Sequence, residues 1–262
     1  MKLKKRLLGF GVALMCVVQA SLAQQSDVAG KKVNEELRTK AEADDAVAQG
    51  SLGQRLLFGI GGIKDEVEGV KWLRKAAEKG DAQVQFVLFI CYHTGRGVPK
   101  DEVEAVKWLR KAADQRLPWA QDKLGSCYRD GTGVATNDVE AAKWYRKAAE
   151  QKFPPGQYHL GACLLEGRGV PKGAEDGTYW LRKAAMLNHA QAQFVLGLCY
   201  FNGRGVAKDE AEGAKWLFLS AAQAQEDTKQ KSNTSLEGTI GEGQQRANDW
   251  IEKSEKPFAR EW

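Results

Sequence analysis

The amino-acid sequence predicts an all-α fold, a solenoid of stacked helix-turn-helix repeats. A six-residue phrase, Trp72-Leu73-Arg74-Lys75-Ala76-Ala77, returns with small changes at 36-residue steps. Its later copies begin at Trp108, Trp144, Trp180 and Trp216. Single positions keep the same step: Gln49, Gln85, Gln121, Gln157 and Gln193; Leu52, Leu88, Leu124, Leu160 and Leu196; Gly59, Gly95, Gly131, Gly167 and Gly203. A unit of this size cannot bury its apolar face alone, so the units must stack.

Residues 1–23 have the pattern of a secretory signal: a basic start, an apolar run from Leu7 to Val18 and small residues before Ala23. The run is shorter than the roughly 20 apolar residues of a bilayer span. Cys16 follows Met15, where lipoprotein processing needs a small residue. We therefore expect an exported bacterial protein, periplasmic or secreted, with no stable membrane insertion after signal cleavage.

The net charge of the whole chain also bears on its partners. The 262-residue chain has a formal charge of +5, but residues 1–23 hold four basic residues and no acidic one. The remainder is nearly neutral, which argues against nucleic acid as a partner, because nucleic-acid binding needs clustered, uncompensated Lys and Arg.

Residues 24–45 are predicted to be an N-terminal capping segment. Leu37, Arg38 and Ala41 lie 36 residues before their counterparts in the first full repeat, so residues 33–43 are expected to form a degenerate second helix. Glu36 stands where the other repeats have Trp. A polar residue there suits the end of a solenoid, whose outer face meets water.

Each repeat between residues 46 and 222 divides into two helices, here called A and B. In the second repeat, helix A is expected from Ala82 to Thr94, ending at Gly95. Helix B is expected to end near Asp114 and to begin with a capping box, in which an N-cap side chain and a Glu three residues later each bond the other's amide. Such boxes are predicted at Asp65/Glu68, Asp101/Glu104, Asn137/Glu140 and Asp209/Glu212, whereas Gly173 and Asp176 should start their helix less firmly.

Helical geometry separates a packed face from a free face on the A helices. Gln85, Leu88 and Tyr92 share the face that repeats, so it is predicted to pack, and the recurrent Trp of helix B is interpreted as a packing ring. The opposite face varies between repeats and is where a solenoid can carry specificity. The predicted protein-binding groove consists of Val87, Ile90, Trp119, Lys123, Ser126, His159, Val195 and Leu198. Trp119 is the expected anchor, with the alternative that it only shields the turn at Arg116.

Residues 223–262 are predicted to hold a connector and a capping helix. Residues 226–234 are polar and are expected to link the last repeat to a helix over residues 240–253. With Trp250 and the segment Phe258 to Trp262, that helix is expected to cover the open end of the repeats.

The stretch 190–206, Ala-Gln-Ala-Gln-Phe-Val-Leu-Gly-Leu-Cys-Tyr-Phe-Asn-Gly-Arg-Gly-Val, followed by Lys208-Asp209 and Ala214-Lys215-Trp216, resembles the Sel1-like repeat. This family is related to the tetratricopeptide repeat. The resemblance covers five units over residues 46–222 and weakens at Phe89 and at Gln54. It implies a right-handed α/α superhelix with A helices along its concave side, and a role as an adaptor that binds a protein or peptide.

A secreted, cysteine-rich branch of this family is reported to bind penicillin or hydrolyse β-lactams, and it has two cysteines in each helix pair. This chain has one cysteine in each of four repeats, at Cys91, Cys127, Cys163 and Cys199. Packed helices lie about 8–10 Å apart, beyond the roughly 4.4–6.8 Å that a disulfide allows between Cα atoms. We therefore expect buried thiols, and membership of that branch is doubtful.

Catalytic and metal-binding motifs are absent from the sequence. It contains no Ser-x-x-Lys, Lys-Thr-Gly, Gly-x-Ser-x-Gly or His-Glu-x-x-His. His93, His159 and His189 lie in different repeats, without the paired spacing of a metal site, and are expected at the surface. The sequence thus favours an exported adaptor without cofactor or metal. The alternative, which rests on family precedent, is a cell-envelope amide hydrolase or penicillin-binding protein.

Overall fold

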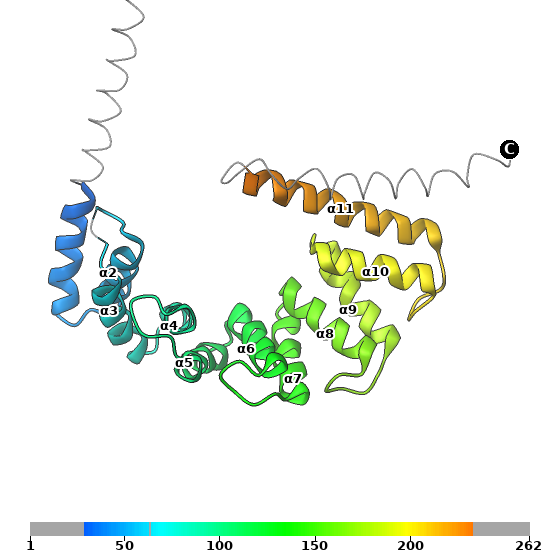
Figure 1. Cartoon of the computed structure of the whole chain (residues 1–262), viewed down its shortest axis with the longest axis horizontal. Helices are drawn as coiled ribbons and strands as arrows, with labels where there is room; N and C mark the ends of the chain where they lie inside the picture. The colour runs from blue at the N-terminus through cyan, green and yellow to red at the C-terminus, as the bar shows by residue number, and fades with distance from the viewer. Residues whose placement is uncertain (1–28, 63, 233–262) are drawn as a thin grey trace, which may run out of the picture. The chain divides into compact units, whose positions relative to one another are not determined.

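The computed structural model describes residues 29–62 and 64–232, and this part of the chain consists of eleven helices and no strand (Figure 1). The predicted all-α fold is therefore confirmed. The first helix covers residues 29–42. It is followed by α2 (Ala46–Phe58), α3 (Glu66–Glu78), α4 (Ala82–Thr94), α5 (Glu102–Asp114), α6 (Pro118–Asp130), α7 (Asp138–Glu150), α8 (Pro154–Glu166), α9 (Ala174–Met186), α10 (Ala190–Asn202) and α11 (Glu210–Ser232). The predicted signal and the predicted helix over residues 240–253 lie outside the described residues.

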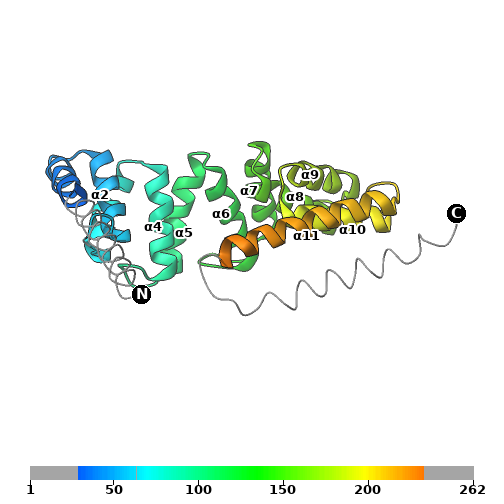
Figure 2. The same cartoon turned by 90° about the horizontal axis from the view of Figure 1, so that it is seen from above.

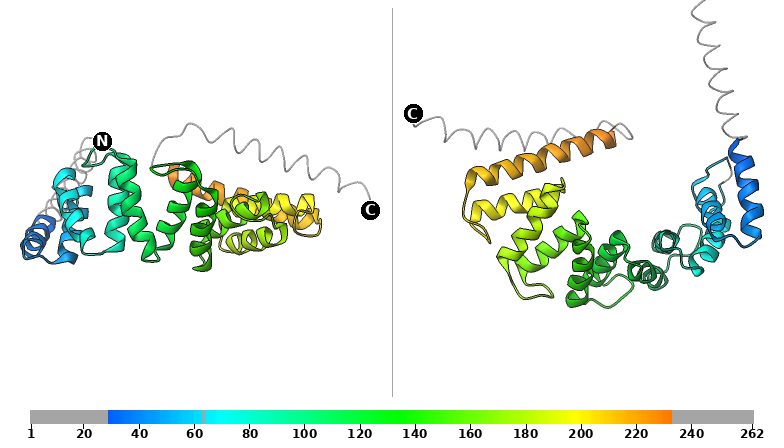
Figure 3. Two further views of the ribbon diagram at one scale, coloured as in Figure 1. Left: turned by 90° about the horizontal axis from the view of Figure 1, so that it is seen from below. Right: turned by 180° about the vertical axis from the view of Figure 1, so that it is seen from behind.

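The chain divides into two compact units, Met1–Asn137 and Asp138–Trp262. In the described residues the first unit contains the helix over 29–42 and α2 to α6, and the second contains α7 to α11. Within each unit consecutive helices pack in pairs, such as α2 with α3 and α8 with α9. The same pairing brings α11 alongside α10 in all views (Figures 1, 2 and 3).

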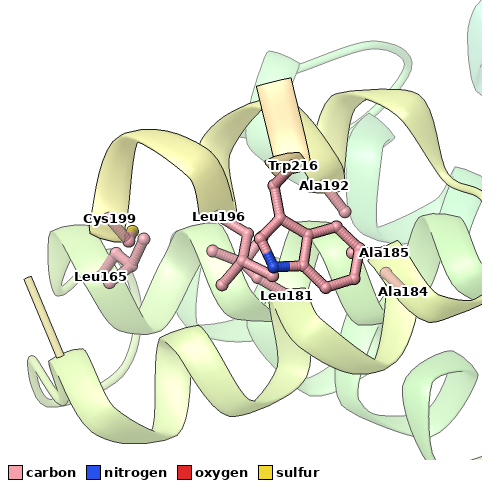
Figure 4. Packing of buried hydrophobic residues seen from close by; sticks show 8 residues of the cluster. All are labelled: Leu165, Leu181, Ala184, Ala185, Ala192, Leu196, Cys199 and Trp216. Carbon is pink, nitrogen blue, oxygen red and sulfur yellow. The ribbon is translucent and has the colours of Figure 1, made fainter. Parts of the chain in front are cut away.

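The core of each unit follows the repeat pattern. The leucines on the packed face of the A helices are fully buried, as are most of their partners on the B helices: Leu52, Leu88, Leu124, Leu160, Leu196, Leu73, Leu109 and Leu181. Burial of one such side chain stabilises the fold by about 1.5–3 kcal/mol. Figure 4 shows the arrangement in the second unit, where Leu181, Leu196 and Trp216 lie among small alanines. The alanines allow the helices to approach closely.

The repeated phrase on the B helices joins three kinds of contact. Trp72, Trp108, Trp144 and Trp216 are buried, as the packing interpretation predicts, and Trp180 is half-buried. The lysine three residues later lies over the ring, with Nζ 3.9 Å from the Trp108 centroid in the case of Lys111. The arginine two residues after the Trp donates to the Tyr hydroxyl of the next A helix. These pairs are Arg74 with Tyr92, Arg110 with Tyr128, and Arg182 with Tyr200.

Two glycines shape each turn from helix A to helix B. Gly95 ends α4 at φ 74°, in the left-handed conformation that suits a residue without a Cβ. Gly97 also has a positive φ, and a Cβ there would lie 2.2 Å from the carbonyl oxygen of Glu66 in the preceding repeat. The first glycine thus ends a helix, and the second allows two repeats to pack closely.

The predicted capping boxes are half right. Asp65, Asp101 and Asp209 each accept a hydrogen bond from the amide three residues later, at 2.8–2.9 Å, while Gly173 provides no such bond. The reverse bond is wrong, because each N-cap amide already donates to a carbonyl of the preceding A helix, as Asp101 does to Tyr92 at 2.9 Å. The glutamates bond elsewhere: Glu68 and Glu212 accept from the Nε1 atoms of Trp72 and Trp216.

The end of the last repeat corrects another prediction. Residues 226–232, which were expected to begin a connector, continue α11 as far as Ser232. The physical reason is composition, since the stretch from Gln223 to Lys231 contains Gln, Ala, Glu and Lys but neither Gly nor Pro.

The cysteines agree with the prediction. Cys91, Cys127 and Cys199 are buried, free thiols, and Cys163 is buried at the equivalent place. Burial raises the pKa of Cys91 and of Cys127 to about 11. Their folded environment therefore favours the protonated thiol.

Candidate functional site

The predicted groove residues fall into two sets, one in each unit. The first patch consists of Val87, Ile90, Trp119, Lys123 and Ser126, on α4 and α6. The second patch consists of His159, Val195 and Leu198, on α8 and α10. The structure places both on the helix face opposite the buried Gln and Leu positions. A single trough through all of them stays a prediction.

The first patch presents apolar side chains to solvent. Ile90 and Trp119 each have 40% of their surface exposed, and Val87 and Ser126 are half-buried. Exposed Ile and Trp side chains on one face favour contact with a partner, since water is a poor neighbour for them. The 40% exposure of Trp119 also favours the anchor interpretation over the shielding one.

Lys123 gives the first patch its charge. Its Nζ lies 6.0 Å from the ring centroid of Phe89, so the side chain extends from α6 to α4. Phe89 itself is buried and stacks on His93 at 5.4 Å. None of the ion pairs found among the described residues includes Lys123. A half-buried ammonium group beside apolar surface is suited to a carboxylate on a partner.

The second patch is built around an aromatic cluster. His159 stacks on Tyr145, with centroids 4.7 Å apart, and Tyr158 stacks on His189 at 5.1 Å. Val195 packs against the core of the unit, and Leu198 is 39% exposed. The ring of His159 is therefore held in place by its neighbours and is half-buried.

The histidines lie deeper than the sequence predicted. All three are half-buried rather than surface residues, because each is held by a ring or a polar group. His189 caps α10 by accepting from the Ala192 amide, at the position where earlier repeats have Asp45 and Asp81. His93 Nδ1 lies 2.7 Å from Glu102. Partial burial opposes it, but hydrogen bonds with His93 and Lys100 hold the pKa of Glu102 below its ordinary value.

Sequence reasoning missed Phe194 and Tyr158 as neighbours of the second patch. Phe194 is 50% exposed and precedes Val195 on α10, and Tyr158 occupies the same place on α8. The signal was present, because equivalent residues in the other repeats are Gly50, Phe86 and Asp122. A position that varies this much belongs with the free face rather than the packed one.

The patches offer binding groups rather than a reaction centre. They combine aliphatic side chains, aromatic rings and one ammonium group, which suit contact with a polypeptide. Among the described residues no group of three or more His, Cys, Asp or Glu side chains could hold a metal ion. In the same residues no helix has the length and hydropathy needed to cross a membrane.

A shallow pocket of about 610 Å³ lies apart from the patches, in the first unit. It is lined by turn residues that include Lys64, Glu66, Val67, Val98 and Pro99. Lys64 and Glu66 already pair there at 3.0 Å. Its polar groups thus satisfy one another.

These features define a class, the helical solenoids whose repeated residues form the core and whose variable residues face solvent. The family model of the Sel1 repeat matches residues 46–81, 82–117, 120–153, 154–189 and 190–224. The chain therefore belongs to the Sel1 repeat family, and the predicted resemblance is confirmed. Sel1 repeats mediate protein interactions.

Two solved structures are similar to this chain in fold and sequence. One is c5321, a protective antigen of uropathogenic Escherichia coli with an SLR fold, at 39% identity and a TM-score of 0.70. The match covers 72% of this chain but 40% of the antigen. The other is a Sel1 repeat protein from Oxalobacter formigenes, at 31% identity and a TM-score of 0.68, with 79% and 81% covered. A search of the curated proteins found no match.

Proposed function

We propose that this chain is an exported adaptor that holds a peptide or protein segment against the free face of its A helices. The observation that carries the proposal is the exposure of large apolar side chains there, Ile90 and Trp119 in the first patch and Leu198 in the second. A side chain of this kind on a solenoid that mediates protein interactions is a natural contact point. The pattern of residues 1–23 supports export.

The first patch indicates the chemistry of the bound segment. Trp119 can bury a large apolar area, and Lys123 can pair with an acidic group beside it. We therefore infer a segment with an apolar residue next to an Asp, a Glu or a terminal carboxylate. Contacts of the second patch with aromatic or aliphatic side chains would add affinity.

The test begins with a pull-down from cell-envelope extract, using the exported chain as bait, and continues with a binding assay of the captured protein. Trp119→Ala and Lys123→Glu should each weaken that binding at least tenfold, because one removes the apolar anchor and the other reverses the charge. Thermal unfolding should change little, since both side chains lie at the surface.

Two changes on helix α5 serve as matched controls. Val103 is 57% exposed and Lys107 is also exposed, and neither is on the free face of an A helix. Val103→Ala and Lys107→Glu should leave binding unchanged. Loss of binding in the α5 variants with full binding in the Trp119 and Lys123 variants would assign the interaction to the B helices and refute the proposal.

No observation in either patch favours the alternative function, a cell-envelope amide hydrolase or penicillin-binding protein. That alternative is not carried forward.

A further inference from the structure

The last described helix lacks the cover that the other B helices have. In earlier repeats the arginine two residues after the Trp binds a Tyr on the next A helix, as Arg182 does with Tyr200 at 2.5 Å. In α11 the two positions after Leu217 are Phe218 and Leu219 instead of Arg and Lys. They are 62% and 39% exposed. Two apolar side chains thus stand where a neighbouring helix normally binds.

The core positions of α11 show the same loss. Leu217 and Ala221 are half-buried, whereas their equivalents in the preceding repeat, Leu181 and Ala185, are 0% and 1% exposed. In that repeat the next A helix supplies the cover, and Gln193 donates to the Ala185 carbonyl at 3.1 Å. We call the surface formed by Leu217, Phe218, Leu219 and Ala221 the end seat. It is an A-helix binding surface with no A helix on it among the described residues.

The chain does not fill the end seat in register, for a local reason. Every earlier turn from a B helix to an A helix contains a residue with positive φ: Asp44, Gly80, Arg116, Lys152 and Asn188. The next position in this series is Ala224. Alanine is the best helix former, and α11 continues past it to Ser232. A sixth A helix would have to arrive by a longer connection.

We propose that the end seat is occupied by this chain's own residues 240–253. In a helix, Ile240, Ala247, Trp250 and Ile251 would share one face, at the spacing i, i+7, i+10 and i+11. That face could bury Phe218 and Leu219. This tethered segment has an advantage over any separate partner, because a short linker gives an effective concentration in the millimolar range.

The linker is long enough for this geometry. Seven residues, 233–239, separate the end of α11 from residue 240. Extended, they span up to about 23–25 Å. The distance along α11 from Ser232 back to Phe218 is about 21 Å, at about 1.5 Å per residue. Residue 240 can therefore lie beside the end seat.

Hydrogen exchange on the full chain, measured by mass spectrometry, tests the proposal. Amides of residues 240–253 should exchange at least tenfold more slowly than in an unstructured peptide of the same sequence. The double variant Phe218→Arg/Leu219→Lys, which restores the residues of the earlier repeats, should abolish that protection. The control is Phe194→Gln, which changes another half-exposed aromatic residue of the second unit and should leave residues 240–253 protected.

A reciprocal variant distinguishes a bound tail from an effect of charge. Trp250→Asp should speed exchange in the α11 amides around Phe218 and leave α8 and α9 unchanged. Unprotected amides over residues 240–253 in the natural chain would overturn the proposal. Protection that depends on protein concentration, together with a doubled mass in light scattering, would also overturn it and assign the end seat to a second copy of the chain.

Discussion

The two glycines of each A-to-B turn have different physical roles. Gly95, Gly131, Gly167 and Gly203 end A helices in the left-handed conformation and leave room for a side chain of the turn. The second glycine of each turn lies against backbone. At Gly133 an added Cβ would be 2.1 Å from the Glu102 carbonyl oxygen, and at Gly205 it would be 2.1 Å from that of Ala174. The second position therefore controls how closely consecutive repeats approach.

Gly133→Ala should destabilise the protein by about 3 kcal/mol or more, because left-handed strain costs about 1–2 kcal/mol and the backbone clash adds to it. The matched control is Gly80→Ala. Gly80 also has a positive φ, but nothing lies within 4 Å of its would-be Cβ. That change should cost only about 1–2 kcal/mol. Urea unfolding of both variants measures the difference, and equal costs would show that the close contact is unimportant.

Left-handed residues mark a limit of sequence analysis at this scale. The glycines at 59, 95, 131, 167 and 203 were predictable as helix ends, since their identity repeats. The left-handed position between helices B and A was not, because it is filled by Asp44, Gly80, Arg116, Lys152 and Asn188. The backbone conformation repeats while the residue type changes, so a search for identical residues misses it.

Among the helices, the recurrent glutamine is the joint between each B helix and the following A helix. Gln85 Nε2 donates to the Ala77 carbonyl at 2.9 Å, and Gln121 does so to Ala113 at 3.0 Å. Gln49, Gln157 and Gln193 make the same bond, always to the residue eight positions earlier. These buried amides satisfy a carbonyl at the end of helix B, where no intrahelical partner exists.

Gln121→Ala should lower the free energy of unfolding by about 1–3 kcal/mol, the usual cost of leaving a buried polar group unsatisfied. Gln83→Ala is the comparison, because Gln83 is exposed on the free face of α4. It should change stability by less than about 0.5 kcal/mol. Thermal or urea unfolding provides the measurement. Similar effects of the two changes would contradict the joint role.

Helix bounds were largely predictable, whereas capping partners were not. The bounds of α4 and the end of α5 follow from Gly95, Asp101 and the 36-residue step. The partner of Glu104 could not be deduced, because the Asp101 amide bonds to Tyr92, a residue of the preceding helix. A capping box is a local pattern, and here a tertiary contact takes its place.

Across the whole molecule, buried thiols predict a stability that depends on alkaline pH. Burial raises the pKa of Cys91 and Cys127 to about 11, from 9.0. Between about pH 9 and pH 11 the unfolded chain therefore loses protons that the folded chain retains, and the free energy of unfolding should fall. Urea midpoints measured at pH 8 and pH 10.5 should show this decrease.

The double variant Cys91→Ala/Cys127→Ala separates the thiols from Lys and Tyr, which titrate in the same range. It should be less stable at pH 8, because it loses buried volume, but its midpoint should fall less on going to pH 10.5. A thiol reagent should label the natural chain only after unfolding. Equal pH dependence in the two proteins would contradict the role of these cysteines.

The fold was predictable at this scale because periodicity reports packing, whereas the site was only partly so. Positions that repeat must be in the core, which gave the helices, their packed faces and the family. The free face was found by elimination, and Ile90, Trp119 and Leu198 are exposed as that argument requires. Side-chain neighbours such as Phe89 beside Lys123 depend on the packing of α4 with α6, and no pattern within one helix contains that information.

The constant spacing of these contacts has a consequence for how the chain can change its length. The glutamine bond spans eight residues, the Arg–Tyr pair 18, and Arg96 to the Leu57 carbonyl 39, so contacts join adjacent repeats. Removal of residues 82–117 would bring each contact's counterpart into the vacated place. Duplication of the same stretch would do so as well. Such a chain can gain or lose whole 36-residue units by recombination without a new set of compensating mutations, so the number of repeats is free to vary while the architecture remains the same.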